Sequence, residues 1–249
     1  MRSGNPALSE KAFERFDVFE VERSVAMTVQ GTAVKTGVLL LLAISAAAFS
    51  WMQFATVGHQ AAMPWMIGGL IGGLVLALVT IFKKEWAPVT APLYAVAEGL
   101  FLGVISAMYN QMFYPGIVLQ AVCLTFGTLF ALLIAYQSGI IKATENFKLG
   151  VVAATGGIML VYLLSLVLSF FGTTIPLIHG NGLIGIGFSL FVVVIAALNL
   201  VLDFDFIEHG AEQGAPKYME WYGAFGLMVT LVWLYLEILR LLAKLSSRD

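Results

Sequence analysis

The chain has 249 residues, of which 60% are hydrophobic and 11% are charged, and its formal net charge is −2. Soluble domains are about half apolar and about a quarter charged, so this composition excludes an ordinary soluble protein and indicates a membrane protein in contact with the lipid bilayer. A near-neutral chain also lacks the basic surface that nucleic-acid binding requires, and a single cysteine, Cys123, excludes an intrachain disulfide and a cysteine metal site.

Residues 1–33 carry charges of both signs and precede an apolar stretch long enough to span a membrane, so they are not a signal peptide. Apolar residues recur among them at helical spacing: Leu8, Ala12, Phe13, Phe16 and Phe19. We predict a cytoplasmic N-terminal segment that lies on the inner membrane surface as an amphipathic helix, with a partly ordered tail as the alternative.

Seven apolar stretches follow, each near the length of about 20 residues that crosses a hydrocarbon layer about 30 Å thick. Their predicted bounds are 34–54, 64–82, 90–109, 116–136, 149–171, 182–206 and 221–242. Three prolines fall in or at the edges of the short outer connections and two in the inner ones: Pro64, Pro115, Pro176, Pro88 and Pro216. The sequence therefore predicts an all-α fold, with one transmembrane domain of seven helices over residues 34–245.

Glycines within the spans are spaced for close helix packing. Gly68, Gly69, Gly72 and Gly73 form two overlapping small-xxx-small pairs, and Gly99 and Gly103 form another. No polar context suited to phosphate binding follows any of them, so we interpret these glycines as packing residues.

Ionisable residues within a membrane are costly and are candidates for function by default. The sequence has five of them in or near its spans: Glu98, Asp203, Asp205, Glu237 and Arg240. Four of the five are acidic, which favours a cation or proton path over an anion path. For Glu98, in the third span, the alternatives are a protonated acid hydrogen-bonded to a neighbouring helix and a place in that path.

The acids of the last two spans have specific neighbours. Asp203 and Asp205 point about 200° apart on a helix, and Asn199 shares the face of Asp203. Both aspartates could also be helix-end charges in contact with the cytoplasm. Glu237 can pair with Arg240 three residues later, or it can face an acid on another helix, share a proton with it and offer oxygen ligands to calcium.

Seven predicted helices, the aspartates that end the sixth and the sequence LYLE in the seventh resemble the Bax-inhibitor-type (transmembrane Bax inhibitor motif) family, and its bacterial branch in particular. The resemblance is strongest over residues 197–245, and EGLFLG in the third span adds to it. It implies a protein of the bacterial inner membrane whose seventh helix is wrapped by the other six. It also implies a pair of aspartates, in the sixth and seventh helices, that act as a pH-sensitive latch on a calcium leak.

By position, Asp203 matches the first aspartate of that pair, and Glu237 takes the place of the second, where the family commonly has LYLD. A basic residue near the end of the second helix also holds the latch in family members, and Lys83 or Lys84 could stand in for it. On straight helices Asp203 lies about 5 Å and Glu237 about 24 Å from the inner surface. A direct pair therefore requires the seventh helix to bend or to project into the cytoplasm.

Three functions remain open on the sequence. They are a pH-sensitive calcium leak gated by a proton-sharing pair of Asp203 and Glu237, a regulator that binds other membrane proteins such as a membrane protease, and a proton-coupled transporter of a small solute. The chain has no His-Glu-x-x-His signature and its three histidines lie in connections, so we expect neither an enzyme nor a bound cofactor. Calcium, if bound, is expected at Asp203 and Glu237.

The distribution of lysine and arginine predicts the orientation, because these charges are retained on the cytoplasmic side. With the N-terminus inside, the inner segments hold ten of the thirteen cations and the outer ones only Arg240, Lys244 and Arg248. We expect a reporter fused after Lys148 to be cytoplasmic, one inserted near His179 to be external, and the C-terminus to be external. Reporters that both reveal the same side would rule out seven spans.

Overall fold

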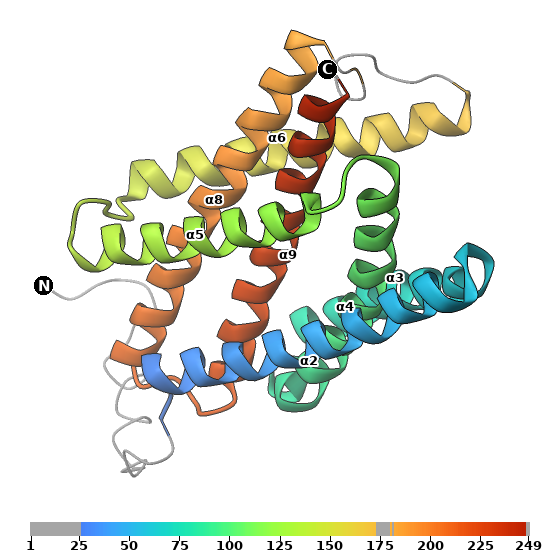
Figure 1. The fold of residues 1–249 in the computed structure, drawn as a ribbon. Helices are drawn as coiled ribbons and strands as arrows, with labels where there is room; N and C mark the ends of the chain where they lie inside the picture. The colour runs from blue at the N-terminus through green and yellow to red at the C-terminus, as the bar shows by residue number, and fades with distance from the viewer. Residues whose placement is uncertain (1–25, 173–179, 181, 248–249) are drawn as a thin grey trace, which may run out of the picture.

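The computed structural model describes residues 26–172, 180 and 182–247, so the predicted amphipathic residues Leu8 to Phe19 and the connection around His179 lie outside the described residues. The described part forms long helices joined by short connections (Figure 1). In chain order these elements are α2 (Val29–Val57), α3 (His59–Phe82), a short 3-10 helix η3 (Lys84–Trp86), α4 (Ala87–Met112), α5 (Ile117–Gln137), α6 (Glu145–Phe170), α8 (Leu183–Glu212) and α9 (Met219–Ser246).

Seven of these helices are long and apolar enough to cross a membrane, which confirms the predicted all-α architecture. Their ends differ from the predicted spans. Gly58 alone, with φ 100°, separates α2 from α3, and Pro64 therefore lies inside α3 and not at the edge of a connection. α8 continues to Glu212, six residues beyond its predicted end. Hydropathy shows where a helix leaves the hydrocarbon, whereas the backbone stays helical through the charged residues that follow.

The last helix, α9, is the central one, as expected for the seventh span. It packs against α2, α4, α5 and α8, and it runs antiparallel beside α8 (Figure 1). Half of the residues in its apolar 18-residue stretch are buried, compared with 17% of the residues in the corresponding stretch of each of α2, α3 and α6. The central helix is therefore held mainly by contacts within the protein, whereas these peripheral spans expose more of their surface.

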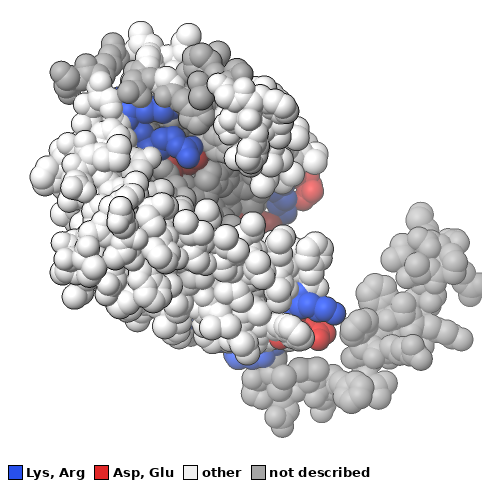
Figure 2. Space-filling model, turned by 90° about the vertical axis from the view of Figure 1, so that its right-hand side faces the viewer, with Lys and Arg blue, Asp and Glu red and all other residues white. Residues whose placement is uncertain are grey.

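Two hydrophobic clusters pack against α9. One joins α5 and α8 to it through residues such as Ile117, Leu200 and Leu234. The other joins α2 and α4 to it through residues such as Leu39, Tyr94 and Phe225. On the outside, the face drawn in Figure 2 is almost free of charged side chains, which gather in a few small groups. Such a surface suits contact with lipid tails.

The predicted packing role of the third-span glycines is visible where α2 crosses α4. A β-carbon added at Gly99 would collide with the carbonyl oxygen of Ala43, and one added at Gly103 would collide with the carbonyl oxygen of Ala47. Helices in a membrane gain stability from such close backbone approach, since lipid is as apolar as the side chains.

We therefore expect Gly103→Ala to lower the stability of the folded protein by about 1–3 kcal/mol, because the added methyl group forces α2 away from α4. The measurement is the midpoint of thermal unfolding in detergent. Gly156→Ala on α6 is the control, since a β-carbon there meets no atom within 4 Å. Equal midpoints for the two variants would contradict the close contact.

Candidate functional site

Most charged contacts of the helical bundle lie at one end, where α9 begins. Lys35 and Lys217 reach Glu220, Lys148 reaches Asp205, and the ammonium nitrogen of Lys84 lies 5.3 Å from the ring centroid of Tyr222. We call this the lysine-rich end. It contains the residues that the sequence assigned to the cytoplasmic side.

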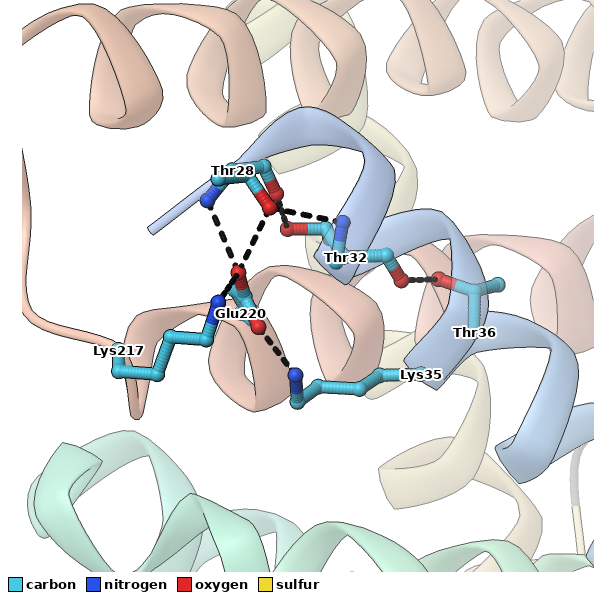
Figure 3. A network of polar contacts seen from close by, with 7 residues as sticks. Thr28, Thr32, Lys35, Thr36, Lys217 and Glu220 are labelled. Atoms are coloured by element: carbon cyan, nitrogen blue, oxygen red, sulfur yellow. Dashed lines mark hydrogen bonds and ion pairs between the residues drawn. The ribbon is translucent and has the colours of Figure 1, made fainter. Parts of the chain in front are cut away.

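The carboxylate of Glu220 is the centre of a polar network at this end (Figure 3). Its side chain is fully buried and forms ion pairs with Lys35 on α2 and with Lys217, whose nitrogen lies 2.8 Å from Oε1. Thr28 donates to the same oxygen from its backbone nitrogen and from its hydroxyl group, each at 2.9 Å. Each carboxylate oxygen of Glu220 therefore has a positively charged partner.

The chain around Thr28 is folded so that it reaches Glu220. Thr28 caps the start of α2, because its hydroxyl group accepts a hydrogen bond of 2.9 Å from the backbone nitrogen of Gly31. Just before it, Met27 donates to the carbonyl oxygen of Ala215 at 2.7 Å. The network therefore ties the beginning of the first span to the beginning of the last.

The sequence analysis missed this network. The one local signal is the spacing of Lys217 and Glu220, which are three residues apart and can pair at the start of a helix. Lys35 lies 185 positions from Glu220, and no pattern in the sequence connects the two.

Asp203 lies where α8 meets the first turns of α9. Its Oδ1 would be 4.0 Å from a β-carbon built at Gly226, and Thr230 hydrogen-bonds to its carboxyl group. Its Oδ2 is buried and accepts no hydrogen bond. In the described part of the chain, every other buried side-chain oxygen or nitrogen has a hydrogen-bond partner. The carboxyl group lines a cavity of about 240 Å³ with Phe206 and Tyr222. An ionised carboxylate there has a high free energy. The group is stabilised when it takes up a proton or when a cation lies beside it.

Asp205 and Asn199 have partners on α6. Asp205 forms an ion pair of 2.8 Å with Lys148 and also lies 3.5 Å from His209. Asn199 donates to the hydroxyl group of Thr155 at 2.8 Å. Both residues therefore attach α8 to α6.

Glu237 is buried in the half of α9 farther from the lysine-rich end. Its Oε1 accepts hydrogen bonds from Arg240 at 2.8 Å and from the hydroxyl group of Tyr162 at 2.9 Å. Arg240 also lies over the ring of Tyr162, 5.4 Å from its centroid. Of the two arrangements that the sequence allowed for Glu237, the structure contains the intrahelical ion pair.

The structure does not bring Asp203 and Glu237 together. Asp203 faces Gly226, and Glu237 follows eleven residues later on one continuous helix, which corresponds to about 16 Å. The expected direct contact between the two acids is therefore wrong in this structure. The physical reason is that Arg240 and Tyr162 already satisfy Glu237, while α9 shows no break that would shift it toward Asp203.

Glu98 lies on α4 and lines a larger cavity, of about 440 Å³, between α3, α4 and α9. Tyr94, one turn earlier, hydrogen-bonds to it. Lys84, one of the two basic residues expected near a latch, lies over Tyr222, which lines this cavity and the cavity of Asp203. Lys83 ends α3 and is exposed.

Within the described residues, no three His, Cys, Asp or Glu side chains are grouped closely enough to hold a metal ion.

These features define the class of the protein: an α-helical membrane protein of seven spans, with a central last helix and acids buried around it. The chain belongs to the family described as Bax inhibitor 1 like, which its sequence matches over residues 5–247. This match confirms the resemblance seen in the last two spans. No curated protein matches the chain.

The two lysines of the Glu220 network differ in exposure, 19% for Lys35 and 47% for Lys217. We expect Lys35→Met to lower the stability by about 3 kcal/mol, because it removes a partner of a buried carboxylate. Lys217→Met, at the more exposed position, is the matched control and should cost about 1 kcal/mol or less. Thermal unfolding in detergent measures both, and an equal loss would contradict the central place of Lys35.

Proposed function

We propose that the protein is a pH-sensitive calcium leak in which Asp203 is the acid that senses pH. Family membership supports this activity, since the resemblance to Bax-inhibitor-type proteins implies a calcium leak. The observation that carries the proposal is the buried, unpaired Oδ2 of Asp203 beside a cavity at the contact of α8 with α9. Passive ion movement requires no enzymatic step and no cofactor besides the ion itself.

The sign of the pH response follows from the chemistry of the carboxyl group. A protonated Asp203 is neutral and does not attract Ca²⁺. A deprotonated Asp203 offers the oxygen ligands that Ca²⁺ prefers, in a place where no basic side chain is paired with it among the described residues. Calcium flux is therefore expected to rise as the pH rises through the titration of Asp203.

In this proposal Glu237 acts separately from Asp203. Its ion pair with Arg240 and its hydrogen bond from Tyr162 join α9 to α6 in the other half of the membrane. Replacement of Glu237 is expected to loosen that contact and change the size of the flux. Asp203 still determines how the flux depends on pH.

The proposal also includes the setting. We place the lysine-rich end in the cytoplasm and the protein in the bacterial inner membrane. Calcium is the transported ion, and the proton is the ion that is sensed. A regulator that binds other membrane proteins, and a proton-coupled transporter, are the competing functions. Neither predicts calcium movement through a membrane that contains this protein alone.

The test is calcium flux in liposomes that contain only the purified protein, measured from about pH 5 to about pH 9. We expect wild-type flux to rise with pH and Asp203→Asn to flatten that profile, because the amide has no proton to lose. Flux indistinguishable from that of empty liposomes would contradict the proposed function.

Asp205→Asn is the matched control, since it lies two residues away and is already paired with Lys148. It should leave the pH profile unchanged, and Glu237→Gln should keep the shape of the profile. A flat profile from Asp205→Asn together with a normal one from Asp203→Asn would assign pH sensing to the other aspartate.

A further inference from the structure

Two neighbouring cavities lie along one face of the first turns of α9. The larger is bordered by α3, α4 and α9 and is lined by Glu98, and the smaller lies between α8 and α9 and is lined by Asp203. Both cavities share three lining residues of α9: Tyr222, Phe225 and Gly226. Two carboxyl groups from different helices therefore line neighbouring cavities at the same short stretch of α9.

Glu98 and Asp203 differ from the other acids of the described residues. Glu145, Asp205, Glu220 and Glu237 each form an ion pair, and Glu85, Glu208 and Glu212 are exposed near helix ends. Glu98 and Asp203 have neither a basic partner nor an exposed position. Of the groups that the structure describes within the bundle, these two carboxyl groups are therefore the ones available to an ion.

Gly226 has no side chain, so the space between the two cavities stays open to a small ion. A β-carbon built there would have one neighbour within 4 Å, the Oδ1 of Asp203 at 4.0 Å. A side chain is therefore sterically allowed at this position, and it would extend into the space that Asp203 faces.

We propose that Glu98 is a second ligand for the permeating divalent cation, which passes between Glu98 and Asp203 at Gly226. This inference rests on the proposed function and adds a residue and a passage to it. One carboxylate neutralises half of the charge of Ca²⁺, whereas two carboxylates neutralise it fully. Oxygen ligands from two side chains also suit the coordination that Ca²⁺ prefers.

The test uses the full chain in calcium-loaded liposomes. We expect Glu98→Gln to lower calcium flux about tenfold or more at every pH, since loss of even a supporting residue commonly costs at least that much in metal affinity. Glu98→Asp, which keeps the charge on a shorter side chain, should restore part of the flux. The elution profile in size-exclusion chromatography checks that each variant is folded.

A second pair of variants tests the passage while both acids remain in the chain. Gly226→Leu should lower the flux as strongly as Glu98→Gln, and Gly226→Ala should lower it less. Gly156→Leu on α6 is the matched control and should retain the flux, because a β-carbon at Gly156 has no neighbour within 4 Å.

Flux close to that of wild type in both Glu98→Gln and Gly226→Leu would overturn the inference and leave the calcium leak in place, provided that Asp203→Asn still alters the pH profile. Absence of flux in wild type would overturn the proposed function itself and the inference with it. The two failures are therefore distinguishable in one set of measurements.

Discussion

A charged side chain inside a membrane domain requires a polar partner from the protein, and the central helix depends on such partners at both ends. At its start, Glu220 is fully buried and is held by Lys35, Lys217 and Thr28. At its other end, Lys244 donates to the carbonyl oxygen of Gly185 at 3.0 Å and to the hydroxyl group of Ser189 at 2.8 Å. Apolar packing alone does not prevent one helix from sliding along another. These buried polar contacts prevent it and fix the position of α9 against α2 and α8.

This fixed position explains why the acids around α9 have different chemistry. Where a helix end brings a lysine or an arginine within reach, the acid forms an ion pair, as Asp205 and Glu237 do. Asp203 and Glu98 face the stretch of α9 from Tyr222 to Gly226, which carries aromatic rings and glycines and no basic side chain. The absence of a partner at these two acids is therefore a consequence of what α9 presents at that depth.

Part of this architecture could be predicted from the sequence. Span number depends on hydropathy over about 20 residues, and the packing role of Gly99 and Gly103 depends on local spacing, so both were predictable. The depth of Asp203 was not, because α8 remains helical through Asp205 and His209, where hydropathy has already fallen. The partner of Glu237 was ambiguous, since an arginine three residues away and an acid on another helix fit the same pattern.

The Glu220 network shows the remaining limit, because the sequence separation of Lys35 and Glu220 gives no sign of their contact. The same holds for Glu98 and Asp203, which become related only because both line cavities at the same stretch of α9. Lys84, over the ring of Tyr222 that lines both cavities, adds a fixed positive charge nearby and opposes the accumulation of cations. In the proposed calcium leak, the two acids attract the cation and this lysine repels it, and the balance of the two limits the rate of passage.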